Sequence, residues 1–232
     1  MFTVALIGPD GSGKTTVGRR LREQLPIPAQ YLYMGVNPQA STHLLPTTRL
    51  AQKLRRALGR QRDAGGPREK SRAVENAHKP LPRRILKSVK SSLSLSNRLA
   101  EEWYRQMVAW HHLRRRHVVI FDRHFFPDYY AYDIAGEATR SLTQRIHGFV
   151  LNHLYPRPDV IIFLDAPAEV LFARKGEGTV ELLEQRRGDY LQMQDLVKHF
   201  EVVDASRDVD AVVQDVSQRI LRFYEAQGGP PR

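Results

Sequence analysis

The chain has 232 residues, 41% of them hydrophobic, which fits one α/β domain with a sizeable core. It contains no cysteine, and this excludes a disulfide framework, a cysteine-based zinc site and a thiol nucleophile. The formal net charge of +11 is confined to one segment: Arg49 to Lys90 holds 14 Lys/Arg and 3 Asp/Glu, and the rest of the chain holds 22 residues of each sign.

Five short apolar runs predict the strands of one buried sheet. They occupy residues 2–7, 31–33, 118–121, 160–164 and 200–203. Helical spacing predicts one helix directly after the first Gly-rich turn, and further helices over about 82–116, 140–154, 167–174, 180–198 and 208–226. Apolar strands that alternate with helices indicate the P-loop type of α/β fold, with a parallel sheet of about five strands and helices on both faces.

The basic segment interrupts this alternation. We expect a single domain over 1–226 with a basic insertion at about 39–95 and a flexible tail at 227–232. In the insertion, Leu50, Leu54 and Leu58 share one helical face beside cationic residues. This pattern suits binding to an anionic membrane surface or a polyanion, and the alternative is that the leucines pack on the domain. No apolar stretch is long enough to span a membrane, so we expect a cytoplasmic protein that is at most peripheral to the membrane.

A phosphate-binding motif follows the first predicted strand. Residues 8–15 read Gly-Pro-Asp-Gly-Ser-Gly-Lys-Thr and match G-x-x-x-x-G-K-[ST] in full. The backbone N–H groups of such a loop surround phosphate oxygens, and the helix that follows adds its positive end. Lys14 is expected to reach the β- and γ-phosphates of ATP, and Thr15 to ligate Mg²⁺. The predicted nucleotide-binding residues are Gly8, Asp10, Gly11, Ser12, Gly13, Lys14, Thr15, Thr16, Arg174 and Lys175.

Acidic residues at strand ends and in the loop are the next candidates, because ligands of parallel sheets gather at the carboxyl ends of the strands. Asp122 is expected to hold Mg²⁺ or to accept a proton from an acceptor hydroxyl, and Arg123 to bind a phosphate. The alternative is a capped turn with a salt bridge. Asp10 is expected to face the acceptor, or else only to stabilise its turn. Asp165 and Asp204 each precede a predicted helix and are interpreted as helix caps.

A cationic loop follows the predicted strand at 160–164. Arg174 and Lys175 lie beside Gly176 and Gly178, which suits a movable loop that closes over phosphates. The next helix carries the pair at 186–187, which could converge on the same site; the alternative is a solvated charged turn. The predicted catalytic residues are Lys14, Asp122, Arg123 and Arg174, and the predicted metal ligands are Thr15 and Asp122.

Together these motifs resemble the thymidylate kinase-like family of P-loop nucleoside monophosphate kinases. The resemblance covers 1–35 and about 98–225, and five stretches carry it in the family's order. They are the phosphate loop with Asp10, Asp122-Arg123-His124, Arg157-Pro158-Asp159 through Leu164-Asp165, Arg186-Arg187-Gly188-Asp189-Tyr190-Leu191, and Asp204-Ala205-Ser206. The resemblance implies an ATP- and Mg²⁺-dependent phosphotransferase that acts on a nucleoside monophosphate such as dTMP.

The chain departs from the family where the acceptor is chosen. The family's Arg-Glu-Pro-Gly-Gly motif is replaced at 34–38 by Met-Gly-Val-Asn-Pro, and the lid is shorter and poorer in arginine. Arg98 and Arg105 bracket the position of the family's helical acceptor arginine. A kinase for a hydroxyl of a nucleoside, sugar or lipid-linked glycan is therefore the alternative, and a nucleic-acid-binding P-loop NTPase is the alternative of another class. The acceptor group, phosphate or hydroxyl, and the oligomeric state, including a homodimer, stay open.

Overall fold

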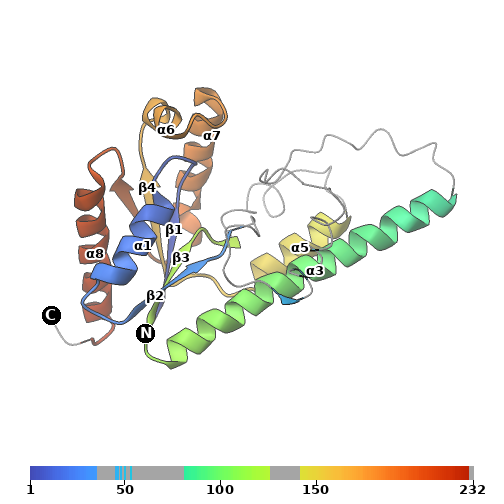
Figure 1. Cartoon of the computed structure of the whole chain (residues 1–232), viewed down its shortest axis with the longest axis horizontal. Helices are drawn as coiled ribbons and strands as arrows, with labels where there is room; N and C mark the ends of the chain where they lie inside the picture. The colour runs from blue at the N-terminus through green and yellow to red at the C-terminus, as the bar shows by residue number, and fades with distance from the viewer. Residues whose placement is uncertain are drawn as a thin grey trace.

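The computed structural model describes residues 1–35, 45, 46, 48, 50, 53, 81–125 and 142–229. Within these residues the chain forms a sheet between two layers of helices (Figure 1). The elements run β1 Thr3–Ile7, α1 Lys14–Gln24, β2 Ala29–Tyr33, α3 Leu81–Arg114, β3 Val118–Asp122, α5 Leu142–His153, β4 Val160–Asp165, α6 Ala168–Lys175, α7 Val180–Leu191, a 3-10 turn at Gln192–Leu196, β5 Phe200–Asp204 and α8 Val209–Ala226.

The sheet has five strands in the order β2-β3-β1-β4-β5, and every neighbouring pair is parallel. The phosphate loop leaves β1, which lies at the centre of this order. In a parallel sheet all strands end at one edge, so the loops after β1, β2, β3 and β4 meet there. The fold thus brings residues 8–15 close to Asp122 and Asp165, which are more than a hundred positions away in the sequence.

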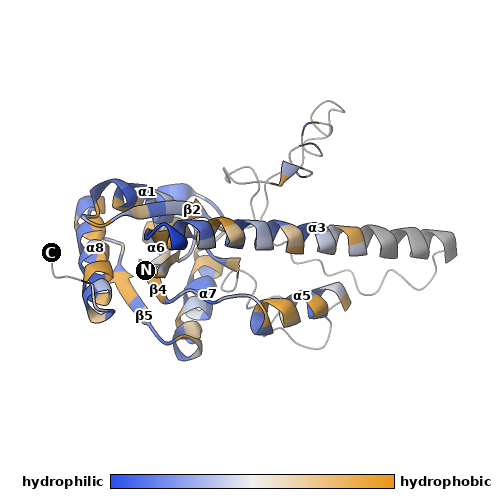
Figure 2. Cartoon of the chain, turned by 90° about the horizontal axis from the view of Figure 1, so that it is seen from below, coloured by the Kyte–Doolittle hydropathy of each residue, from blue (hydrophilic) through white to orange (hydrophobic). Residues whose placement is uncertain are grey.

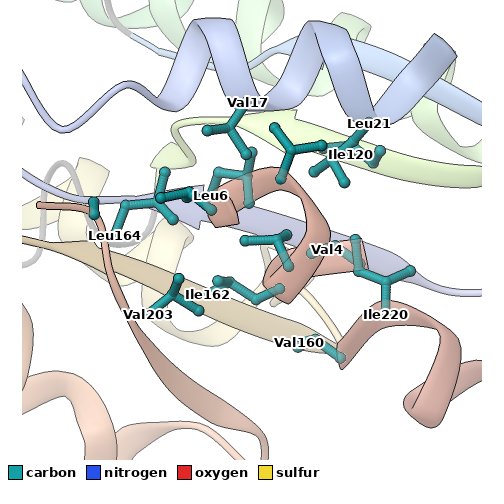
Figure 3. Packing of buried hydrophobic residues seen from close by; sticks show 14 of the residues in the cluster. Val4, Leu6, Val17, Leu21, Ile120, Val160, Ile162, Leu164, Val203 and Ile220 are labelled. Carbon is teal, nitrogen blue, oxygen red and sulfur yellow. The ribbon is translucent and has the colours of Figure 1, made fainter. Parts of the chain in front are cut away.

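Alternate residues of the central strand enter two different cores. Val4 and Leu6 pack with α1 and α8 on one face, and Ala5 and Ile7 pack with α3 and α5 on the other. Figure 3 shows the first core, where Val17 and Leu21 of α1 cover the sheet from one side of the labelled cluster. A strand that is buried on both faces is mainly apolar, which is why the central strands β1, β3 and β4 read as apolar runs.

Helices α3 and α5, which cover the same face of the sheet, each expose apolar side chains to solvent. The 34-residue helix α3 extends well past the sheet (Figure 1). Figure 2 shows hydrophobic residues on α5 and mainly hydrophilic ones on α1. Leu142 and Phe149 of α5 are 70% and 57% exposed. None of the described helices combines the length and the hydrophobicity needed to cross a membrane.

The predicted elements agree with this architecture. The P-loop α/β fold and the five parallel strands are confirmed, and the helix expected over 180–198 ends at Leu191, where the 3-10 turn begins. Of the predicted insertion, residues 81–95 belong to α3. Most of its remaining residues, and residues 230–232 of the tail, lie outside the described part of the chain, so the division into domain, insertion and tail stays a prediction.

Candidate active site

The phosphate loop is a tight turn that closes around the side chain of its own lysine. Gly8 and Gly11 adopt φ angles of 146° and 91°, a region that side chains with a Cβ rarely enter. The buried Lys14 ammonium donates to the carbonyl oxygens of Gly8 and Pro9, at 2.8 and 2.6 Å, and to Ser12 Oγ at 3.2 Å. The first helical turn of α1 begins at Lys14, so its free N–H groups point into the loop.

Gly11 also sets how closely helix α6 approaches the phosphate loop. A Cβ built at Gly11 would lie 2.6 Å from the carbonyl oxygen of Leu171, which belongs to the α6 backbone. We expect Gly11→Ala to lower the free energy of unfolding by about 1–3 kcal/mol in urea denaturation, because a strained φ and a backbone clash are combined. Gly188→Ala on α7 is the control, since a Cβ there meets nothing within 4 Å and alanine favours a helix. Equal stability of Gly11→Ala and wild type would contradict this account.

Asp122 is buried at the end of β3 and uses only one carboxylate oxygen. Its Oδ2 accepts hydrogen bonds from Thr15 Oγ1 at 2.6 Å and from the Tyr31 hydroxyl at 2.5 Å. Its Oδ1 is buried and has no hydrogen-bond partner. Burial, and then the charge of Asp122, raise the pKa of Tyr31, which therefore stays a donor. A carboxylate and a hydroxyl at one point are oxygen donors of the kind that Mg²⁺ prefers.

These donors fit Mg²⁺ held partly through water and phosphate. The described residues contain no group of three or more His, Asp or Glu side chains able to hold a metal ion by themselves. Mg²⁺ in kinase sites keeps several waters and takes only one or two protein ligands besides phosphate oxygens. Thr15 and Asp122, whose buried Oδ1 has no hydrogen-bond donor, would supply these two protein ligands.

Asp10 collects three cations from three different elements. Arg123 Nη2, at the end of β3, lies 2.5 Å from its Oδ1, and Arg186 Nη1 of α7 lies 3.1 Å from its Oδ2. Lys175 Nζ, at the end of α6, lies 3.5 Å away. Burial raises the pKa of Asp10, but the charges of Arg123, Lys14 and Lys175 outweigh it and hold this pKa well below its usual range. The carboxylate is therefore ionised and neutralises cations that surround the phosphate loop.

Arg123 reaches Asp10 from an unusual backbone conformation. Its φ is 66°, a left-handed value that is uncommon for a residue other than glycine, and its N–H donates to the Leu6 carbonyl at 3.1 Å. A Cβ built at Gly35 would lie 2.6 Å from Arg123 Cδ, so the glycine after β2 leaves room for the arginine stem. Strained backbone of this kind clusters at functional sites.

His124, the last residue of the Asp-Arg-His motif, belongs to the core. Its ring packs against Phe121 and Tyr155, with centroids 5.3 and 5.7 Å away. Burial lowers the pKa of His124 to about 3, so the ring is neutral at physiological pH. It is not a candidate for proton transfer there.

The cations of α6 and α7 that are predicted to converge on the site divide between two sets of partners. Lys175 and Arg186 lie on Asp10, as described above, whereas Arg174 donates to the carbonyl oxygens of Ala205 and Ser206 at 2.7 and 3.1 Å. Arg174 therefore joins α6 to the loop after β5 in this structure. Its predicted role on the transferring phosphate stays a prediction.

Two predicted helix caps are wrong. Asp165 accepts two hydrogen bonds from Arg187, at 2.7 and 2.9 Å, and the N-cap residue of α6 is Pro167, which makes no side-chain cap. Asp204 accepts from the N–H and hydroxyl of Ser206, and Asp208 caps α8 instead. The bond between Arg187 and Asp165 ties α7 to β4 and so helps to place the neighbouring Arg186.

Of the two candidate acceptor arginines, Arg105 lies at the site and Arg98 is exposed. Arg105 Nη1 donates to the Gly35 carbonyl at 2.7 Å, and its Nη2 lies 3.4 Å from Glu101. The guanidinium also lies over the ring of Phe125, 5.4 Å from its centroid. Arg105 is thus a buried strut between α3 and the ends of β2 and β3.

Sequence reasoning did not single out several buried polar residues of this region. They are Glu101, Glu102, Gln106 and His147, together with the half-buried Tyr31. Glu102 and His147 form a buried contact of 2.9 Å between α3 and α5. The sequence does carry a signal for the residues on α3. Positions 101–102 and 105–106 are polar, yet they lie on the helix face that should pack against the sheet.

Comparison with known proteins places this geometry in context. A family model described as AAA domain matches residues 3–123. Among solved structures, thymidylate kinase from Candida albicans is similar with 16% identity and a TM-score of 0.57, over 98% of this chain and 92% of that one. Deoxyadenosine kinase from M. mycoides, with the products dCMP and dCDP bound, is similar with 17% identity and a TM-score of 0.50, over 95% and 99%. A comparison with curated proteins gave no match. The fold that the resemblance implied is confirmed.

Proposed function

We propose that this chain, which belongs to the AAA domain family by a match over residues 3–123, is an ATP- and Mg²⁺-dependent phosphotransferase of the thymidylate kinase-like type. The observation that carries the proposal is the convergence of Lys14, Lys175, Arg123 and Arg186 on the phosphate loop. Phosphoryl transfer needs positioned positive charge more than any other protein contribution. The first acceptor that we propose is a nucleoside monophosphate such as dTMP.

The residues on the ATP side have separate tasks. Lys14 exchanges its hydrogen bonds to the loop carbonyls for the β- and γ-phosphates, and the loop N–H groups hold the remaining oxygens. Thr15 and Asp122 hold Mg²⁺, which supplies charge neutralisation of the phosphates when bound. The other predicted loop residues, Gly8, Gly11, Ser12, Gly13 and Thr16, shape or line this cradle.

The cations on Asp10 serve the transferring phosphoryl group. In the structure Lys175 and Arg186 form ion pairs with the Asp10 carboxylate. A bound phosphate would be a stronger anionic partner for these two cations than the carboxylate is. Asp10 thereby keeps the lid helices α6 and α7 close to the loop before the nucleotide arrives. Arg123 lies on the side of Asp10 that faces the ends of β2 and β3, which is the side that we assign to the acceptor.

We expect Asp10→Asn to impair the acceptor more than ATP. The amide keeps the size of the side chain but removes the charge that holds Arg123, so the acceptor KM should rise about ten- to a hundredfold, the worth of one charge-assisted hydrogen bond. The ATP Kd should stay within about threefold, because the contacts of Lys14 remain. Steady-state kinetics and calorimetry measure both constants. Glu177→Gln is the control, since its exposed pair with Lys175 should contribute little. Equal losses for ATP and acceptor would argue against this assignment.

A second acceptor class is a hydroxyl, and two observations favour it. Asp122 Oδ1 is a buried carboxylate oxygen without a donor, so it can accept a hydroxyl proton. The Arg105 Nη atoms are engaged by Gly35 and Glu101, which leaves them poorly placed for an acceptor phosphate. A nucleoside, a sugar or a lipid-linked glycan would be an acceptor of this class.

Matched acceptors test the proposal directly. ATP consumption with Mg²⁺ is measured for dTMP against thymidine, then for other nucleotide–nucleoside pairs and free sugars. Turnover with the monophosphate and not the nucleoside supports the first class, and the reverse supports the hydroxyl class. Turnover only with DNA or RNA would overturn the small-acceptor kinase in favour of a nucleic-acid-binding NTPase. The predicted binding of a membrane or polyanion through Arg55, Arg56 and Arg60 involves residues outside the described part of the chain, and the homodimer stays a prediction.

A further inference from the structure

Tyr31 lies where it can orient the carboxylate of Asp122. The strands β2 and β3 pair so that Tyr31 stands opposite Ile120, and Tyr33 stands opposite Asp122. Tyr31 is therefore the diagonal neighbour of Asp122 on one face of the sheet, within reach of a long aromatic side chain. Its hydroxyl donates to Asp122 Oδ2 at 2.5 Å, across 91 positions of sequence.

The path of the Tyr31 ring is fixed by a glycine in α1. A Cβ built at Gly18 would lie 3.0 Å from both Cδ2 and Cε2 of Tyr31, closer than ordinary packing allows. A glycine inside a helix is less favourable than alanine by about 1 kcal/mol. Here its missing side chain makes room for the ring between α1 and the sheet.

Two donors on one oxygen leave the other oxygen with a defined direction. The last torsion of an aspartate is soft and roughly two-fold, so a carboxylate held by one hydrogen bond can rotate. Thr15 and Tyr31 hold Oδ2 from α1 and from β2, and Oδ1 stays buried without a partner. Thr15 belongs to the nucleotide-binding helix start, whereas Tyr31 belongs to the sheet that also carries Asp122.

We propose that Tyr31 is a positioning residue for phosphotransfer, which holds the Asp122 carboxylate in the orientation that binding of Mg²⁺–ATP would require. The inference rests on the proposed function, because it assigns a task toward the same metal. Tyr31 lies on a strand of the sheet, so its hydrogen bond holds Asp122 independently of the phosphate loop. Thr15 is therefore not needed to hold the carboxylate and remains able to ligate the metal. No step of the reaction passes through the Tyr31 proton.

The test compares Tyr31→Phe with Tyr224→Phe, a matched loss of one hydroxyl on α8. ATP binding is measured by calorimetry with and without Mg²⁺, and thermal unfolding is recorded for both variants. We expect Tyr31→Phe to bind ATP without Mg²⁺ as tightly as the wild type does. The factor by which Mg²⁺ strengthens ATP binding should be about tenfold smaller in the variant, the worth of one hydrogen bond to a charged group. In turnover, kcat should fall about tenfold while the acceptor KM is unchanged. Tyr224→Phe should match the wild type in every binding constant.

Three outcomes would overturn the inference. The first is an unchanged Mg²⁺ effect in Tyr31→Phe, which would leave the kinase proposal intact as long as Lys14→Ala is inactive. The second is an equal loss of affinity with and without Mg²⁺, together with a lower Tm, which would make Tyr31 a structural residue only. The third is a wild type that gains no ATP affinity from Mg²⁺, which would contradict the metal assignment in the proposed function as well.

Discussion

Lys14→Ala is expected to lower kcat/KM at least about a hundredfold, because transition-state charge stabilisation by one positioned cation is worth several kcal/mol. The Lys14 ammonium is buried and already points into the loop, where it contacts two carbonyl oxygens. In the variant no other cation can take this place, since Lys175 and Arg186 lie on the Asp10 side of the loop. ATP affinity should therefore fall with and without Mg²⁺.

Two controls separate this loss from a loss of fold. Lys14→Met keeps the apolar stem and removes only the charge, so it should be as inactive as the alanine variant. Lys198→Ala removes an exposed lysine that precedes β5 and should leave turnover unchanged. Circular dichroism and thermal unfolding verify that each variant is folded. A folded Lys14→Ala enzyme with near-normal turnover would sink the phosphotransferase proposal.

The sheet could be predicted because its chemistry is local. The central strands β1, β3 and β4 are buried on both faces, so a run such as Val118–Phe121 must be apolar in every position, and an acidic residue can follow only where the strand ends. The phosphate loop was equally readable, since its glycines and Lys14 act within eight consecutive residues. Asp10 and Asp122 followed from their places in these two patterns.

The rest of the site depends on pairings that cross the sequence. The hydroxyl of Tyr31 meets Asp122 across 91 positions, and Arg105 reaches the Gly35 carbonyl across 70. Neither contact has a spacing rule, because it is set by strand order and helix packing. For Asp165 the local sequence indicates the wrong partner. It suggests a helix cap, but Arg187 donates two charge-assisted hydrogen bonds to the carboxylate, and these are stronger than one hydrogen bond from a backbone N–H.

Asp122→Asn should be the second most damaging change, and it should differ in kind from Lys14→Ala. The amide presents an oxygen on one side and a nitrogen on the other. With its oxygen on Thr15 and Tyr31, the nitrogen takes the position of Oδ1 and repels a cation; with the opposite orientation, both donors lose their acceptor. We expect kcat to fall about a hundredfold, as for loss of one charged transition-state contact. Titration of turnover with Mg²⁺ should show a higher half-saturating concentration.

The binding signature decides whether Asp122 acts through the metal. ATP without Mg²⁺ should bind Asp122→Asn as well as the wild type or better, because a buried negative charge near the phosphates has been removed. The gain in affinity on adding Mg²⁺ should largely vanish. Asp204→Asn is the control, since Asp204 also ends a parallel strand but its carboxylate contacts residues of the turn that follows it, Ser206 and Arg207. If Asp122→Asn keeps its full response to Mg²⁺ and loses only turnover, Asp122 acts as a base on the acceptor, and the hydroxyl class of acceptor gains direct support.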